Sequence, residues 1–119
     1  MIRLVHIFDL KSSDNDESFI NWLDANLYGK AKEFGCEERK TWVFIDGVKN
    51  PYKRGRRVVK RPKYILEAFW KSQKGVDDFR EWLLSVDGEN YRKNWNDNVK
   101  NHSVLRYIDF APVQNIGDD

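Results

Sequence analysis

Two kinds of hydrophobic spacing alternate along this chain, and their order restricts its fold more than any other feature. Residues 2–10 carry apolar side chains on both faces of an extended segment, which is typical of a strand that is covered on both sides. A cluster of capping and acidic residues at 14–18 is followed by Phe19 and Leu23 at helical spacing. The chain therefore opens with a strand and an amphipathic helix, which we expect to end near residues 34–35.

The later apolar runs continue the same alternation. β-branched and aromatic residues predict strands, whereas apolar residues at intervals of three or four predict helices. The further predicted elements are strands at 41–45, 64–70 and 104–110 and helices at 75–83 and 91–99. The two predicted helices are separated only by a glycine-containing turn, so the order is strand, helix, strand, strand, helix, strand.

This order of elements predicts a ferredoxin-like α+β fold, in which a four-stranded antiparallel sheet carries the helices on one face. We expect a single domain over residues 1–119, with a basic connection around 49–63 and a loose tail around 113–119. The strands carry large apolar residues on both faces, and one layer of helices covers only one of them. We therefore expect a homodimer whose two sheets close into a dimeric α+β barrel.

The composition narrows the class of protein. Mean hydropathy is −0.77, yet 14% of the residues are aromatic, which indicates a folded chain rather than a disordered one. No signal peptide and no apolar run of membrane-spanning length is visible, so we expect a cytoplasmic protein with no membrane partner. The single cysteine, Cys36, cannot form an internal disulfide, and no histidine or cysteine spacing is typical of a metal site. We expect no cofactor, although a haem pocket would need only one axial histidine.

Several segments resemble a known superfamily. Residues 5–11, followed by 19–23 and Tyr28, resemble the opening of the RedY-like and HapK-like small proteins that are found beside prodigiosin-type pigment pathways. The segments 64–70 and 78–82 resemble, more loosely, the dimeric α+β barrel superfamily, which includes small monooxygenases of antibiotic biosynthesis, haem-degrading enzymes, lyases and isomerases. The resemblance implies a homodimer with a small-molecule pocket between sheet and helices. It also implies a cofactor-independent reaction of secondary metabolism, such as monooxygenation, cyclisation or isomerisation of an aromatic intermediate.

His6 is the leading candidate for chemistry. An imidazole on an otherwise apolar strand can act as acid and base near neutral pH, which predicts a catalytic role, with a hydrogen-bonded core histidine as the alternative. His102 lies in a polar run, where a solvated loop residue is the favoured interpretation. We predict that an aromatic ligand pocket is lined by Trp42, Tyr64, Trp70, Trp22 and Tyr28, with Arg106 orienting the ligand. Simple core packing is the alternative for the aromatic residues, an inter-subunit salt bridge is the alternative for Arg106, and catalysis as such stays open.

A second hypothesis comes from the segment 49–63, which holds eight lysines and arginines and no acidic residue. Such a block can neutralise phosphates, so nucleic acid or another polyanion would bind through Arg54, Arg56, Arg57 and Arg61. A solvated hairpin loop is the favoured interpretation. RNA-recognition domains share the order of elements, but the strand at 64–70 lacks their basic and aromatic motif. Small-molecule binding is therefore the first hypothesis, and polyanion binding is the alternative.

Overall fold

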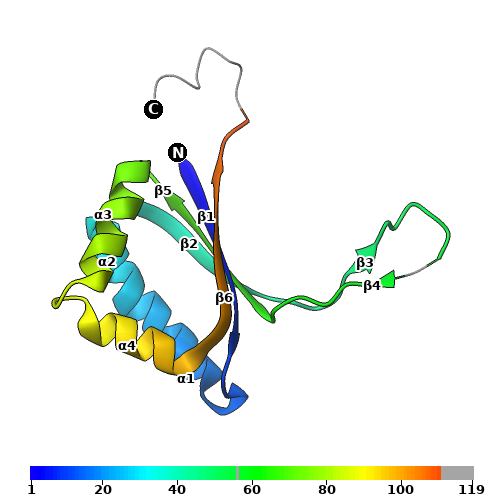
Figure 1. Ribbon diagram of the computed structural model, residues 1–119, viewed down its shortest axis with the longest axis horizontal. Helices are drawn as coiled ribbons and strands as arrows, with labels where there is room; N and C mark the ends of the chain where they lie inside the picture. Colours follow the sequence, from blue (N-terminus) through cyan, green and yellow to red (C-terminus); the bar gives the residue numbers. More distant parts are fainter. Residues whose placement is uncertain (56, 111–119) are drawn as a thin grey trace.

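The computed structural model describes residues 1–55 and 57–110, and it confirms the predicted ferredoxin-like α+β fold. A four-stranded antiparallel sheet has the order β2-β5-β1-β6, and the helices lie on one of its faces (Figure 1). The sheet consists of β1 (Ile2–Leu10), β2 (Cys36–Val43), β5 (Tyr64–Trp70) and β6 (Val99–Ile108). The expected tail around 113–119 lies outside the described residues.

The first helical run follows β1 directly. A short 3₁₀ turn, η1 (Ser13–Asn15), is capped by Ser12, whose hydroxyl accepts a hydrogen bond from the amide of Asp14. The run continues as α1 (Asp16–Trp22), a π-helical turn η2 (Leu23–Leu27) and α2 (Tyr28–Glu33). It ends at Gly35, whose φ of 109° lies in a region that glycine adopts without a steric cost.

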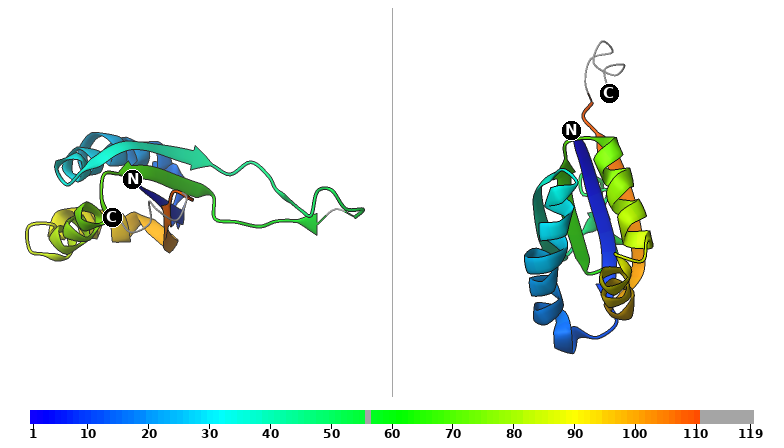
Figure 2. Two further views of the ribbon diagram at one scale, coloured as in Figure 1. Left: turned by 90° about the horizontal axis from the view of Figure 1, so that it is seen from above. Right: turned by 90° about the vertical axis from the view of Figure 1, so that its left-hand side faces the viewer.

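The second helical pair consists of α3 (Gln73–Leu84) and α4 (Glu89–Asn98). Ser72 caps α3, because its hydroxyl accepts from the amide of Gly75 at 3.1 Å. The turn between the helices needs Gly88, since a Cβ there would lie 2.3 Å from the carbonyl oxygen of Trp82. Figure 2 shows the two groups of helices side by side over the sheet.

The core lies between the sheet and the helices. Alternate residues of β1 and β5 point toward the helices, and Phe8 on β1 and Leu23 on η2 are fully buried. No helix of the described residues lies on the opposite face of the sheet (Figure 1). By register, that face presents Trp42, Leu105 and Tyr107, which are large side chains between two fifths and one half exposed.

Both boundaries of the two edge strands differ from the prediction, since β2 and β6 begin five residues earlier and end two residues earlier than expected. β1 and β5 have the predicted bounds, but β2 begins at Cys36 and β6 begins at Val99. Both are edge strands, and their first halves are rich in charged and polar side chains that face solvent. Backbone pairing with β5 and β1 extends these strands where hydrophobic alternation gives no signal.

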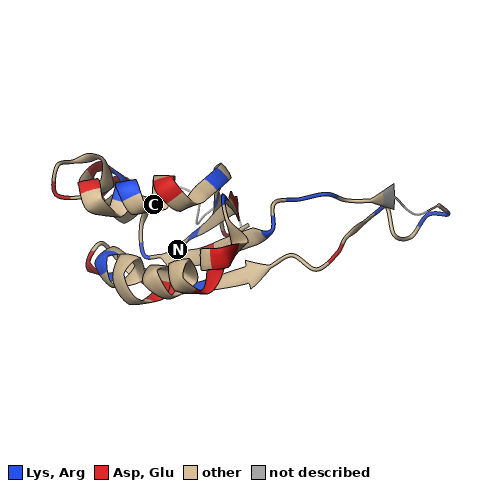
Figure 3. Ribbon diagram, turned by 90° about the horizontal axis from the view of Figure 1, so that it is seen from below, with Lys and Arg blue, Asp and Glu red and all other residues tan. Residues whose placement is uncertain are grey.

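The segment between β2 and β5 forms an arm, residues 44–63, that projects from the body of the protein (Figures 1 and 2). It closes as a small two-stranded ladder of β3 (Val48–Lys49) and β4 (Arg57–Val58). Lysines and arginines lie along it (Figure 3). The exposed cations include Lys49, Lys53, Arg54, Lys60 and Arg61. Arg56 lies outside the described residues, and only the backbone of Arg57 is described.

Candidate functional site

A cavity of about 300 Å³ lies between the sheet and the helices. Leu66 and Ala68 of β5 line it on the sheet side, and Ala31 of α2 and Phe79 of α3 line it on the helix side. Ala68 and Ala31 are core positions filled by short side chains. Because large side chains at these positions would fill the space, the short ones leave an apolar chamber that is large enough for a compact organic molecule.

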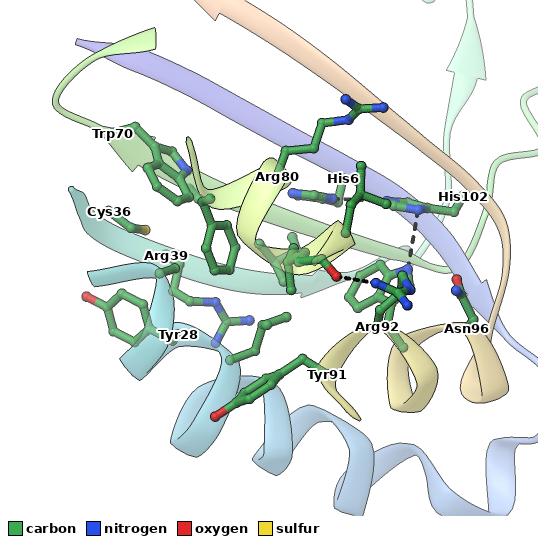
Figure 4. A pocket seen from close by; sticks show the side chains of 18 residues that line it. His6, Tyr28, Cys36, Arg39, Trp70, Arg80, Tyr91, Arg92, Asn96 and His102 are labelled. Carbon is green, nitrogen blue, oxygen red and sulfur yellow. Dashed lines mark hydrogen bonds between the residues drawn. The ribbon is translucent and has the colours of Figure 1, made fainter. Parts of the chain in front are cut away.

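A pair of histidines lies in one wall of this chamber. The Nδ1 of His6 on β1 lies 3.0 Å from the Nε2 of His102 on β6. The two ring planes differ by 11° and their centroids are 5.2 Å apart, so the rings meet edge to edge through that hydrogen bond. The indole Nε1 of Trp95 on α4 donates to the Nδ1 of His102 at 3.3 Å. Three elements therefore join in one hydrogen-bonded chain (Figure 4).

A β-bulge places His102 in this chain. Ile7 pairs with Ser103, whereas Asp9 pairs with Lys100, so β6 contains one extra residue beside β1. The extra residue is accommodated at Asn101, whose backbone φ is 56°. The side-chain amide nitrogen of Asn101 donates to the Asp9 carboxylate at 3.0 Å. His102 thus lies on the strand β6, beside His6, and the interpretation of His102 as a loop residue was wrong.

Burial sets the protonation of the pair. Desolvation, together with the neighbouring His102 and Arg39, lowers the pKa of His6 from 6.5 to about 3. Desolvation also lowers the pKa of His102. Both imidazoles are therefore neutral at physiological pH, and each has one donor and one acceptor nitrogen.

The charged groups that line the chamber are cationic. Arg39 of β2 forms an ion pair with Asp24, donates to the Thr41 hydroxyl at 3.1 Å and stacks over the ring of Tyr28. Arg92 of α4 donates to the Leu83 carbonyl at 2.6 Å. Arg80 of α3 is the third arginine in the lining. Within residues 1–55 and 57–110, no aspartate or glutamate lines the chamber.

Cys36 and Trp70 lie at the same end of the chamber, where they are paired across β2 and β5. Desolvation raises the pKa of the Cys36 thiol to about 11, so it is not a thiolate at neutral pH. The Nε1 of Trp70 is buried, and it has no hydrogen-bond partner among the described residues. A buried donor of this kind is costly unless a water or a ligand satisfies it.

The structure brings together some of the predicted site residues and separates others. His6, Trp70 and Tyr28 line the chamber. The other four lie elsewhere: Trp42 is on the helix-free face of the sheet, Trp22 packs against Phe19, Tyr64 is buried with its hydroxyl 3.3 Å from Asp16, and Arg106 pairs with Asp77 of α3 at 2.7 Å.

Several polar residues of the site were not predicted, among them Arg39, Trp95 and His102. Arg39 was missed because its segment was not expected to be a strand, and alternation along β2 would have placed it on the helix side. Trp95 was noticed only as part of a helical repeat. His102 depends on the bulge, for which the glycine-free run Asn98-Val99-Lys100-Asn101-His102 gives no strong signal.

Comparison with solved structures shows that this chain shares its fold with known proteins. No family model and no curated protein sequence matches the chain. The crystal structure of HapK from Hahella chejuensis is similar with a TM-score of 0.65 and 8% identity, over 94% of this chain and 95% of that one. A dimeric ferredoxin-like protein from an uncultured marine organism has a TM-score of 0.65 and 13% identity, over 94% and 97%.

A third structure extends the same comparison. The protein of the DABB family from Mesorhizobium loti, which has a ferredoxin-like fold, matches with a TM-score of 0.62 and 14% identity, over 92% of this chain and 97% of that one. The chain therefore has the fold of the dimeric α+β barrel superfamily. No helix in the described residues is both long enough and apolar enough to cross a membrane.

Proposed function

We propose that this protein binds a compact, apolar and partly aromatic metabolite in the chamber between the sheet and the helices, and acts on it without a cofactor. The observation that supports this proposal is the chamber of about 300 Å³, whose lining is mostly apolar and carries His6 in one wall. Pockets of this size with few polar groups are typical of small-molecule sites. In this proposal His6 is the polar side chain that contacts the ligand.

A substitution that fills the chamber tests the proposal. Ala68 lies on the chamber floor, whereas Ala25 is an exposed alanine of η2 outside the lining. The neutral fluorescent probe 1-aminoanthracene should bind the wild-type protein and Ala25→Leu with equal affinity. Ala68→Leu should weaken binding at least tenfold, because the added side chain occupies the probe's volume. Unchanged binding by a folded Ala68→Leu protein would exclude the chamber as the binding site.

We also propose that two copies pair through the helix-free face of the sheet. Trp42, Leu105 and Tyr107 on that face are large and half exposed, which is unusual for a monomer unless the surface is used. The marine ferredoxin-like protein with the same fold is described as dimeric. A homodimer would cover these side chains and leave the chamber on the other face of each sheet.

The arm supports a second candidate function, the binding of a polyanion. Its exposed cations, among them Lys53, Arg54 and Arg61, project away from the body, where phosphates can reach them (Figure 3). No described residue of the arm lines the chamber. The two functions can therefore be tested separately.

A further inference from the structure

The indole N–H of Trp95 determines the direction of both hydrogen bonds in the chain that runs from Trp95 through His102 to His6. An indole N–H can donate but cannot accept, so the Nδ1 of His102, which lies 3.3 Å from the Trp95 Nε1, must be an acceptor without a hydrogen. Neutral His102 then carries its hydrogen on Nε2 and donates it to the Nδ1 of His6 at 3.0 Å. Neutral His6 consequently carries its own hydrogen on Nε2.

The Nε2 of His6 is free for a ligand. It lies across the imidazole ring from the atom that bonds His102, and it makes no hydrogen bond to another residue in the described part of the chain. His6 lines the chamber and is drawn between His102 and the chamber interior in Figure 4. The nitrogen available to a ligand in the chamber is therefore an N–H donor.

Several other polar groups of the lining are also donors, although Asn96 and the tyrosine hydroxyls of the lining can accept as well. Trp70 presents a buried Nε1–H with no partner among the described residues, and it lies on the same face of β5 as the chamber floor. Arg39 and Arg80 add cationic donors, and no carboxylate is in the described lining. A ligand that carries only donors would leave the Nε2–H of His6 and the buried Nε1–H of Trp70 without an acceptor, at a cost for the buried group.

We propose that the chamber selects flat apolar ligands that carry an oxygen acceptor, such as a ketone, quinone or enolate, and that the Nε2–H of His6 binds this oxygen. Trp95 is the positioning residue, because its indole fixes the hydrogens of both imidazoles. This inference rests on the proposed function and adds the class of ligand. His6 acts as a neutral donor that stabilises negative charge on the oxygen, and it is not the base, since its free nitrogen already carries a hydrogen.

Nuclear magnetic resonance of the ligand-free, ¹⁵N-labelled full chain at neutral pH tests the positions of the hydrogens. We expect a hydrogen on Nε2 and none on Nδ1 in both His6 and His102. Trp95→Phe should turn this single pattern into a mixture, whereas Trp22→Phe, which alters a tryptophan that contacts neither imidazole, should keep it. A hydrogen on Nδ1 of His6 in the wild-type protein would overturn the inference.

A matched pair of probes tests the class of ligand. Fluorenone and fluorene have nearly the same shape, but only fluorenone has a carbonyl oxygen. The wild-type protein should bind fluorenone roughly three- to tenfold more tightly, which is the factor for one net hydrogen bond. His6→Leu should reduce this ratio to about one and Trp95→Phe should reduce it in part, while both variants still bind fluorene.

The possible results separate the two proposals. If the wild-type protein binds both compounds equally, the inference is overturned and the proposed function stands. If neither compound binds, the proposed function fails, and the hydrogen positions measured without a ligand then decide the inference alone. A loss of fluorene binding together with a lowered melting temperature would identify a folding defect in a variant, and the wild-type ratio and the resonance data would then carry the decision.

Discussion

The histidine pair links protonation to folding at the scale of single residues. In the folded protein the pKa of His6 is lowered from 6.5 to about 3, chiefly by burial, and that of His102 is lowered by burial as well. An unfolded chain takes up protons on both imidazoles near pH 6.5, while the folded chain takes them up only at lower pH. The stabilisation is therefore complete above pH 6.5 and is lost as the pH falls toward 3.

Urea denaturation between pH 7 and 5 measures this effect. The free energy of unfolding of the wild-type protein should decrease as the pH falls. If the unfolded chain binds one proton more than the folded chain, the free energy of unfolding changes by about 1.4 kcal/mol per pH unit. His6→Gln, which is polar but has no titratable ring, should show a smaller slope, with the remainder due to His102. A slope in His6→Gln equal to that of the wild-type protein would show that His6 does not bind a proton on unfolding.

Two glycines have opposite roles at the scale of the elements. Gly29 lies inside α2 with nothing within 4 Å of an added Cβ, so it only weakens the helix. Gly88 allows the close turn from α3 to α4, where an added Cβ would lie 2.3 Å from the Trp82 carbonyl oxygen and 2.6 Å from the Leu83 Cα. Backbone atoms cannot move aside there without shifting a helix.

The same substitution at these two positions should therefore change stability in opposite directions. Gly29→Ala should raise the free energy of unfolding by about 0.5–1 kcal/mol, which is the difference in helix propensity. Gly88→Ala should lower it by about 2 kcal/mol or more, as expected for overpacking against backbone. Thermal melts of both variants beside the wild-type protein measure the two shifts. A stable Gly88→Ala protein would mean that the turn has a different conformation.

The elements also show which parts of the fold can be predicted from sequence. The bounds of β1 and β5 were predicted, because these central strands carry apolar residues on both faces and turn residues mark their ends. The beginnings of β2 and β6 were not, since backbone pairing at a sheet edge does not require apolar side chains. His6 was singled out as an imidazole among apolar residues. Its partners His102 and Trp95 depend on a bulge and on helix placement, which no local pattern encodes.

At the scale of the whole molecule, the proposed dimer predicts a molecular mass and a position at which a charged substitution should separate the two copies. Static light scattering at micromolar concentration should give twice the chain mass of 14.2 kDa. Leu105→Glu, on the helix-free face, should shift the protein toward the monomer, because it would bury a charge in the interface. Val86→Glu, at an exposed turn between helices, is the control and should stay dimeric. A wild-type monomer would leave the face open for another partner.

The arm makes a separate prediction about polyanions. We expect weak, non-specific binding of single-stranded RNA that falls steeply with salt and disappears near about 0.15 M, where screening is strong. Changing Arg54, Arg56, Arg57 and Arg61 to Gln should abolish this binding and leave 1-aminoanthracene binding intact, because the arm lies away from the chamber. Submicromolar, sequence-dependent RNA binding at physiological salt that this variant loses would make nucleic-acid recognition the primary function.

Because the β3–β4 ladder of the arm is separate from the main sheet, the polypeptide can be cut in the arm without breaking that sheet. β2 and β5 pair with each other from Cys36 to Val43 without help from β3 or β4, so the sheet is complete before the arm begins. A cut by trypsin beside Lys53 or Arg54 would divide the polypeptide into two fragments that stay associated through this sheet and its core. New chain ends or an inserted reporter domain could be placed at the same tip, which makes the arm the natural point for splitting this protein into complementing halves.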